Sequence, residues 1–398
     1  MSEFKTLDQI DFAGKRVLLR ADLNVPMKDG RITDSARITE AAVALRELLD
    51  GGAGVVLTSH MGRPKGQVAP EYSLRPVASR LAEELGGADI TFVDGWDGSR
   101  AEDAAAALKP GDVLLLENLR FDPGEEANDA VFAARLAGLA DLYVDDAFSC
   151  AHRAHASIAG VPRYLPSVAG RLMQKELDAL QTALENPVHP VAAIVGGNKI
   201  SSKLGVLENL IAKVDHLLIG GAMAHTFLLA GGIEVGRSLA EPAMIDTARA
   251  VTAAAAAAGC NIILPTDVRV AHLLTENAPS RALPVDAIPA DQMALDIGPK
   301  TARAMNEVIA AARTVIWNGP LGAFEVTPFD TGTNTVARTV AMRTNIGALK
   351  SIAGGGGTMA ALVHAKAAKD FTYVSLAGGA FLEWLEGRKL PGIEALKG

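Results

Sequence analysis

Basic side chains stand at the ends of short apolar runs in the first half of the chain. Guanidinium forks match the geometry of phosphate and carboxylate groups, so together these side chains could bind a small, highly anionic ligand. Each arginine taken alone could equally pair with a local surface carboxylate. The polar and basic side chains at these run ends are Arg20, Asp22, Asn24, His60, Arg63, Asn118, Arg120, Asp146, His152 and Arg153, with Arg37 in a following segment.

The apolar runs of the second half end in glycines instead. Glycine between a strand and a helix allows backbone N–H groups to approach a phosphate at a helix N-terminus. Lys199 and Lys203 follow the first glycine pair four residues apart, so both can lie on one face of a helical start and meet phosphate charge. The pattern suits a nucleotide, although a double glycine alone is often only a tight turn. The glycines are Gly196–Gly197, Gly220–Gly221, Gly319, Gly354–Gly357 and Gly378–Gly379.

Other short patterns carry less chemistry. The sequence has no GxxxxGK[ST] loop and no clean GxGxxG followed by an acidic residue about 20 positions later. His152 and His155 have helical spacing without an evident third ligand, so we expect no metal site built by the protein alone. Cys150 is expected to be a buried thiol rather than a nucleophile. Asp145 and Asp146 are expected to organise their loop.

Strands and helices must alternate to bring these residues together. Most of the apolar runs are continuously apolar, which is typical of strands buried on both faces of a parallel sheet, and most segments between them show helical spacing. The pattern therefore predicts an α/β fold with parallel sheets, in which ligands bind beyond the carboxyl ends of the strands. The runs begin near residues 16, 54, 90, 112 and 142, and then near 191, 216, 261, 294, 314, 351 and 373.

The two series of runs are separated around residues 160–190. A length of 398 residues suits two domains of about 200 residues each. The stretch GRLMQKELDALQTALE, from Gly170, reads as one amphipathic helix that NPVHP stops. We interpret residues 171–186 as a connector between a first domain, residues 1–170, and a second domain that begins at residue 187.

Composition excludes several classes of protein. The net charge is −8, and the chain has no excess of basic residues such as a phosphate backbone requires, so we expect no nucleic-acid partner. Cys150 and Cys260 lie far apart without metal-finger spacing, which fits a reducing cytosol and a cytoplasmic protein. No stretch approaches 18 strongly apolar residues, so we expect no membrane span.

Longer motifs resemble the phosphoglycerate kinase family over essentially the whole chain. The matching stretches are RADLNVP from Arg20, HMGRP from His60, LLENLRF from Leu115, DDAFSCAHRAHAS from Asp145, GGNKISSKL from Gly196, LDIGPKT from Leu295, WNGPLGAFE from Trp317 and LEWLEGRKLPG from Leu382. The resemblance implies two Rossmann-like domains with mainly parallel sheets, joined by a hinge helix. It also implies a cytosolic, mostly monomeric enzyme of glycolysis that transfers a phosphoryl group reversibly between ATP and the carboxylate of 3-phosphoglycerate.

The family's functional residues can be placed on matching positions. By the resemblance, 3-phosphoglycerate would bind the domain of residues 1–170, MgATP or MgADP would bind residues 187–374, and residues 375–398 would return to the first domain. Arg37, Lys199 and Lys203 would be catalytic. The substrate-binding residues would be Asp22, Leu23, Asn24, Arg37, His60, Met61, Gly62, Arg63, Arg120 and Arg153. The nucleotide-binding residues would be Lys199, Lys203, Asn318, Glu325, Gly355, Gly356, Gly357 and Thr358.

A few positions depart from the family pattern, mostly in the nucleotide half. Gly357 stands where the family has an aspartate that serves the metal-bound nucleotide, and Leu376, Asn198 and Asp145 also differ. Mg²⁺ is therefore expected to arrive with the nucleotide. An alternative is a ligand-binding relative with impaired nucleotide turnover. A nicotinamide-dependent dehydrogenase would rest on fold analogy alone, and the dinucleotide fingerprint is missing.

Overall fold

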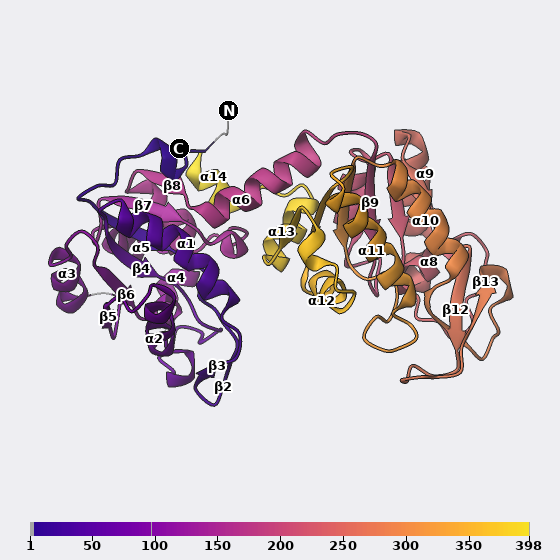
Figure 1. Ribbon diagram of the computed structural model, residues 1–398, viewed down its shortest axis with the longest axis horizontal. Coiled ribbons are helices and arrows are strands. Elements are labelled where there is room, and N and C mark those ends of the chain that lie inside the picture. Colours follow the sequence, from indigo (N-terminus) through magenta and orange to yellow (C-terminus); the bar gives the residue numbers. More distant parts are fainter. Residues whose placement is uncertain (1–3, 97, 398) are drawn as a thin grey trace. The chain divides into compact units, whose positions relative to one another are not determined.

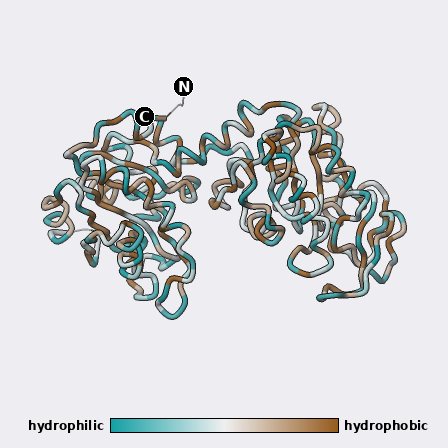
Figure 2. The backbone as a smooth tube through the Cα atoms, in the orientation of Figure 1, coloured by the Kyte–Doolittle hydropathy of each residue, from teal (hydrophilic) through white to brown (hydrophobic). Residues whose placement is uncertain are grey.

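The computed structural model describes residues 4–96 and 98–397, and it divides into two compact units (Figure 1). Unit 1 consists of Met1–Leu177 and Lys389–Gly398, and unit 2 of Asp178–Arg388. Hydrophobic residues recur along the strands of both units (Figure 2). Each unit is an α/β structure around a six-stranded sheet in which every pair of neighbouring strands is parallel. This confirms the fold class expected from the sequence.

The sheet of unit 1 is covered by apolar side chains on both faces. Successive residues of its central strand β1 point to opposite sides, so Val17 and Leu19 belong to one hydrophobic cluster and Leu18 to another. This is why the run is continuously apolar rather than alternating. The strands, in spatial order, are β5 (Ile90–Val93), β6 (Val113–Leu116), β4 (Gly54–Thr58), β1 (Arg16–Arg20), β7 (Leu142–Asp145) and β8 (Ser167–Ala169).

The helices of unit 1 lie between the strands along the chain, except for the C-terminal helix α14. They are α1 (Ala36–Asp50), α2 (Arg75–Glu84), α3 (Ser99–Ala106), α4 (Pro123–Glu126), α5 (Ala130–Ala137) and α14 (Pro391–Leu396). A small hairpin of β2 (Met27–Lys28) and β3 (Arg31–Ile32) lies between β1 and α1. The C-terminal helix α14 is part of this unit, since Gly392 N donates to Ala151 O.

Unit 2 repeats the parallel arrangement. Its strands, in spatial order, are β11 (Asn261–Ile263), β10 (His216–Ile219), β9 (Val191–Val195), β15 (Thr314–Asn318), β16 (Lys350–Gly354) and β17 (Tyr373–Ser375). The helices are α7 (Leu204–Ile211), α8 (Ala222–Ala230), α9 (Ile245–Ala258), α10 (Pro299–Ala311), α11 (Thr331–Asn345), α12 (Gly356–His364) and α13 (Gly378–Leu385).

One expected strand belongs to a different sheet. The run at residue 294 forms β14 (Met293–Ile297), which pairs antiparallel with β12 (Asp267–Ala271), and β13 (Arg281–Pro284) pairs with the other edge of β12. The short apolar run indicates a strand but does not encode the direction of its neighbour. The strands β8, β12 and β13 were not predicted from the sequence.

The segment interpreted as a connector is helical. It forms α6 (Arg171–Leu180) and continues as a π-helical turn, Gln181–Glu185, and the boundary between the units falls within α6. The buried Asp146 fixes its first turn, because its Oδ1 accepts hydrogen bonds from Leu172 N (2.7 Å) and Met173 N (3.1 Å). Of the segment expected to return to the first domain, residues 375–388 are part of unit 2, and Lys389–Gly398 are part of unit 1. The division of the chain into functional domains and the role of α6 as a hinge stay proposals.

Among the described residues, no helix has both the length and the hydropathy that crossing a membrane requires.

The buried carboxyl of Asp145, at the end of β7, should make stability depend on pH. Its Oδ1 accepts a hydrogen bond from Ala147 N (3.0 Å), while its Oδ2 is buried without a hydrogen bond. Burial raises the pKa of Asp145 to about 7, so the folded protein retains a proton that the unfolded chain releases near pH 4. Ionisation at higher pH therefore reduces stability. We expect Asp145→Asn to raise the free energy of unfolding at pH 8 by on the order of 1 kcal/mol.

Chemical denaturation of both proteins at several pH values checks this expectation. The stability advantage of the Asp145→Asn variant should shrink as the pH falls from 7 toward 4. At the lower pH, Asp145 of the native sequence keeps its proton in the unfolded chain as well as in the folded protein. An advantage that is the same at pH 8 and at pH 4 would contradict a buried ionisation.

Candidate active site

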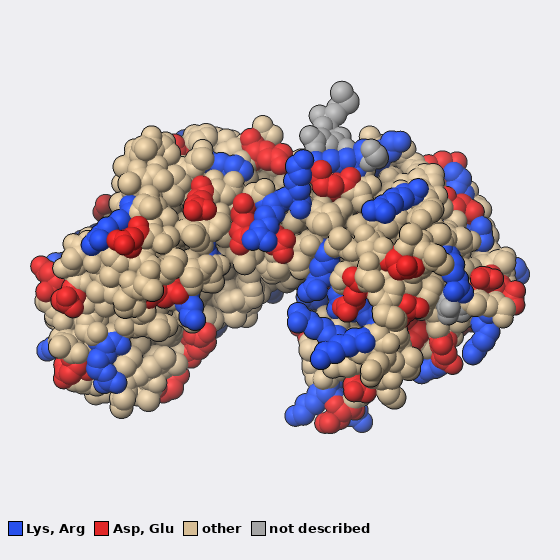
Figure 3. All heavy atoms as spheres, turned by 180° about the vertical axis from the view of Figure 1, so that it is seen from behind, with Lys and Arg blue, Asp and Glu red and all other residues tan. Residues whose placement is uncertain are grey.

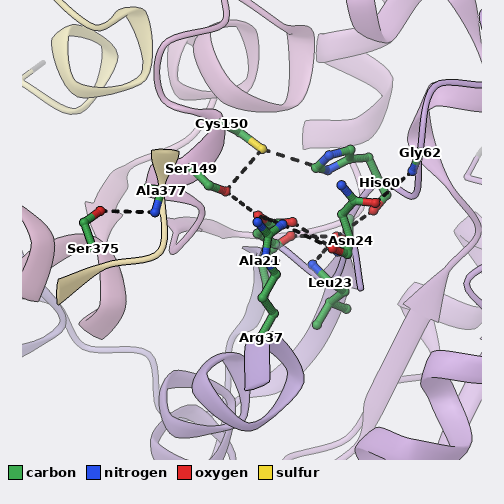
Figure 4. Close-up of polar contacts among 12 residues, drawn as sticks. Ala21, Leu23, Asn24, Arg37, His60, Gly62, Ser149, Cys150, Ser375 and Ala377 are labelled. Atoms are coloured by element: carbon green, nitrogen blue, oxygen red, sulfur yellow. Dashed lines mark hydrogen bonds and ion pairs between the residues drawn. The ribbon is translucent and has the colours of Figure 1, made fainter. Parts of the chain in front are cut away.

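The segment after β1 and the first turn of α1 form the centre of the site in unit 1 (Figure 4). Arg37 Nη1 lies 2.6 Å from Asp22 Oδ2 and donates to Asn24 O at 3.2 Å. Asp22 also accepts a hydrogen bond from Ser149 Oγ. The backbone of Leu23 is fixed by a hydrogen bond, since its N–H donates to Ser59 Oγ at 2.8 Å. The β1 end, α1 and the loop after β7 thus meet at one carboxylate.

The loops after β4 and β6 are tied to the same place. Gly62 N donates to Asn24 Oδ1 at 2.9 Å, and Arg120 Nη1 donates to Gly62 O at 2.8 Å. Asn118 Nδ2 donates to Met61 O at 2.8 Å. Because these strands are parallel and adjacent, their carboxyl ends lie at one edge of the sheet, and side chains distant in sequence converge there.

The cluster holds positive charge in a buried place. Arg20 and Arg120 have exposed fractions of 0% and 3%. Burial lowers the pKa of Arg120, and the neighbouring charges of Arg20 and Arg153 lower it further. Arg120 Nε is buried without a hydrogen bond, although Glu126 Oε1 lies 3.4 Å from it. Guanidinium groups in this situation gain from an incoming anion.

His60 is a neutral side chain in this field. Its ring is buried, and burial together with the charges of Arg20, Arg120 and Arg37 holds its pKa well below the ordinary value. His60 therefore adds no imidazolium charge to the cluster near pH 7. Arg63, directly after Gly62, is exposed, and no hydrogen bond or ion pair within residues 4–96 and 98–397 joins its side chain to the cluster. Lys and Arg side chains gather at one edge of unit 1 (Figure 3).

In unit 2 the ends of β9 and β15 approach backbone to backbone. A Cβ on Gly196 would lie 1.9 Å from Pro320 O, and one on Gly319, which has φ +99°, would lie 2.2 Å from Gly196 O. No other residue fits at these two positions. The predicted glycine turns are therefore required by packing as well as by any ligand.

Lys203 and the start of α12 meet behind these turns. Lys203 Nζ contacts Asn318 Oδ1, and burial lowers the pKa of Lys203 to about 8. Asn318 Nδ2 donates to Gly354 O at 2.7 Å, and a Cβ on Gly355 would lie 2.8 Å from that nitrogen. Thr358 Oγ1 donates to Gly354 O at 2.8 Å. The arrangement presents a helix N-terminus, with its free N–H groups, beside a lysine.

The remaining predicted nucleotide residues are differently placed. Lys199 and Glu325 have exposed side chains, and no hydrogen bond of either side chain joins it to the other predicted residues in the described part of the chain. Gly356 and Gly357 open α12, with Gly355 as its N-cap. A Cβ on Gly357 would have ordinary contact with Pro320 Cδ at 3.7 Å, so a side chain fits there.

Comparisons with known proteins point to one family over nearly the whole length of the chain. The family described as phosphoglycerate kinase matches residues 7–388. The chain belongs to the phosphoglycerate kinase family. It is 55% identical to a phosphoglycerate kinase of Methylorubrum extorquens over 398 residues, covering 100% of this chain and 99% of that one. It is 56% identical to that of Sphingopyxis alaskensis, with both chains fully covered.

Solved structures of phosphoglycerate kinases have the same fold. The structure from Coxiella burnetii is 42% identical with a TM-score of 0.92, covering 99% of this chain and 98% of that one. The structure from Pyrococcus horikoshii OT3 is 30% identical with a TM-score of 0.79, covering 98% of each. The family resemblance deduced from the motifs is thereby confirmed.

Among residues 4–96 and 98–397, no group of three His, Cys, Asp or Glu side chains could hold a metal ion. Near the start of α12, Asn318 and Thr358 contribute polar atoms, but Gly357 contributes no carboxylate. A cation at this place would therefore depend on oxygen ligands from a bound nucleotide and from water.

Several residues of the unit 1 site were not predicted from the sequence. Ser149 contacts Asp22, and Ser59 holds Leu23. Arg20 was recognised only as a residue at a strand end, yet it contacts His60. Serines near a motif are too common to single out, and only the tertiary structure shows their partners. The motif DDAFSC around Ser149 is the one signal that could have identified it.

The clustered arginines should make the protein respond to anions. We expect sulfate to raise the melting temperature by several degrees more than sodium chloride of equal ionic strength, because a divalent anion relieves the repulsion that chloride only screens. Calorimetry of the native chain checks this, with Arg120→Gln as the test variant. The variant should lose most of the specific response, whereas Arg75→Gln, on α2, should keep it. Equal responses to the two salts would contradict a built anion site.

Proposed function

We propose that this chain catalyses reversible phosphoryl transfer between ATP and the carboxylate of 3-phosphoglycerate, giving 1,3-bisphosphoglycerate and ADP. Membership of the phosphoglycerate kinase family supports the reaction. The observation that carries the proposal is the buried group of guanidiniums at the carboxyl end of the unit 1 sheet. Their charges exceed those of the carboxylates that contact them, so a ligand with both a phosphate and a carboxylate fits.

The reaction needs charge neutralisation rather than a base. The acceptor carboxylate is already ionised at pH 7, and the transferred group spreads negative charge over its oxygens. We assign Arg37 to the acceptor carboxylate and its developing anhydride, and His60, Arg63, Arg120 and Arg153 to the substrate phosphate. Neutral His60 donates a hydrogen bond there without adding charge.

The nucleotide is assigned to unit 2. Lys203, with a pKa lowered to about 8, is still mostly protonated at pH 7 and can meet phosphate oxygens beside the N-terminus of α12. Lys199 is exposed and free to turn toward the transferred group. Glu325 is assigned to the ribose. The catalytic role of each, like the other site residues, is part of the proposal.

Mg²⁺ would be held mainly by the nucleotide phosphates and water, with Asn318 and Thr358 near its ligands. When bound, it would neutralise charge on the phosphates. The chain's own residues would align the acceptor through Arg37 and Asp22, and shield it from water, which would otherwise compete as acceptor.

The alternative of a ligand-binding relative without turnover gains no support from the comparisons, because full-length relatives are named phosphoglycerate kinase. A role in glycolysis or gluconeogenesis follows from the proposed reaction. We further propose that the enzyme is a cytoplasmic monomer whose partners are its small-molecule substrates.

A coupled assay with 3-phosphoglycerate, ATP and Mg²⁺ tests the proposal. Formation of ADP that depends on all three additions supports it. Binding of both ligands without turnover would instead establish the ligand-binding alternative.

Arg37 is the first residue to test. We expect Arg37→Ala to lower kcat by about 100-fold or more, since its charge acts most strongly in the transition state. Arg46→Ala, on the exposed side of the same helix, is the matched control and should stay within about twofold of the native rate. A folded Arg37→Ala protein with kcat within about threefold of native would show that the assignment is wrong.

Gly357 should limit the use of the metal-bound nucleotide. Its backbone has no positive φ and its Cβ position is open, so Gly357→Asp should fold normally. We expect MgATP to bind about tenfold more tightly, because the carboxylate can hold a water of the hydrated ion. Metal-free ATP should bind more weakly, since the same carboxylate repels its phosphates.

Calorimetric titration with ATP, with and without Mg²⁺, measures both effects. Gly357→Asn has nearly the same size without the charge and should change neither affinity by more than about threefold. If Gly357→Asp binds both forms of ATP more tightly, or binds MgATP with unchanged affinity, Gly357 does not limit binding of the metal-bound nucleotide.

A further inference from the structure

A chain of buried hydrogen bonds runs behind the anion site of unit 1. Arg20 Nη2 lies 3.2 Å from His60 Nδ1, and Arg20 Nε donates to Ser157 Oγ at 2.9 Å. Ser157 Oγ in turn donates to Glu125 Oε1 at 2.6 Å, and Ser157 N donates to Glu125 Oε2 at 2.8 Å. All four residues are buried, with Arg20 and Glu125 at 0% exposure. This series of hydrogen bonds begins at His60, which we assign to the ligand, and ends at the carboxylate of Glu125, which we do not.

The donors and acceptors along this chain can have only one order. A guanidinium donates and never accepts, so His60 Nδ1 must accept from Arg20 and cannot carry a proton. Neutral His60 therefore has its proton on Nε2. Ser157 can accept from Arg20 only because its own hydroxyl proton points to Glu125. Each bond thus fixes the next.

Glu125 supplies the charge that keeps Arg20 in place. Burial raises the pKa of Glu125, whereas Arg20 and the two hydrogen bonds from Ser157 favour its ionised form. Both of its oxygens accept from Ser157, which fixes the carboxylate in one orientation. A buried cation without this carboxylate would be costly. The fork of Arg20 is therefore held with one N–H directed at His60.

We propose that Glu125 and Ser157 are positioning residues for 3-phosphoglycerate binding. They act through Arg20, which fixes His60 as a neutral donor with its N–H on Nε2. This inference rests on the proposed function for the identity of the ligand. Neither residue is among those that we assign to the ligand. A purely structural role would affect folding and all kinetic parameters, whereas positioning affects the phosphate side of one substrate.

Three substitutions separate these roles. Ser157→Ala removes the hydroxyl that links Arg20 to Glu125, and Glu125→Asp keeps the charge but withdraws the carboxylate from Ser157. We expect each to raise KM for 3-phosphoglycerate about tenfold, with KM for MgATP and kcat within about twofold of native. Ser157→Thr restores a hydroxyl and should recover most of the affinity.

Tyr143→Phe is the matched control. The Tyr143 hydroxyl donates to the backbone carbonyl of Ser157 at 2.6 Å and takes no part in the chain. Its loss should lower the melting temperature by a few degrees without changing KM for 3-phosphoglycerate. If Ser157→Ala raises this KM no more than Tyr143→Phe does, or changes both substrates alike, the positioning role is overturned.

Nuclear magnetic resonance of protein labelled with ¹⁵N-histidine gives a readout that needs no turnover. The native His60 should show an unprotonated, hydrogen-bonded Nδ1 and a protonated Nε2 from pH 6 to pH 8, and His60→Gln assigns the signals. In Ser157→Ala the Nδ1 signal should move toward that of a free imidazole. A native Nδ1 that carries a proton would overturn the proposal. An inactive native enzyme with the expected signals would refute only the proposed function.

Discussion

Repulsion among buried like charges at the carboxyl end of the unit 1 sheet is the constraint on which the site depends. Burial and the neighbouring charges of Arg20 and Arg153 lower the pKa of Arg120, and His60 stays neutral beside these arginines. Asp22 and Glu125 compensate part of this charge, through Arg37 and through Ser157 respectively. The remainder is available for a ligand. The parallel sheet makes this possible, because adjacent strand ends bring these residues to one edge whatever their distance in sequence.

Unit 2 has the same architecture but different residues at its strand ends. Its strand ends carry few charges, and Gly196 and Gly319 are packed so closely that no side chain fits. Backbone N–H groups at the start of α12 and the half-buried amine of Lys203 take the place of arginines. The nucleotide that we assign to unit 2 would bring Mg²⁺ with it, so less protein charge would be needed there than for a metal-free substrate phosphate. The absence of a carboxylate at Gly357 reduces the number of charged groups in unit 2 further.

The predictability of each feature follows from its physical origin. Continuous apolar runs indicated the parallel strands, since both faces of each sheet are covered, as Leu18 and Leu19 show on β1. The direction of β14 could not be predicted, because pairing is decided by β12, which lacks such a run. The arginine cluster followed from residue type and strand-end position. The contacts of Ser157 and Glu125 could not, because single buried serines and glutamates leave no pattern in a sequence until the tertiary structure pairs them.

We propose that unit 1 presents a preformed site for a ligand with a phosphate and a carboxylate, independent of the nucleotide. Isothermal titration of 3-phosphoglycerate into the native protein, without nucleotide or Mg²⁺, is the decisive measurement. The charge cluster predicts one-to-one binding that weakens steadily as sodium chloride is raised, because salt screens the arginines. Absence of binding until MgATP is added, or binding indifferent to salt, would contradict it.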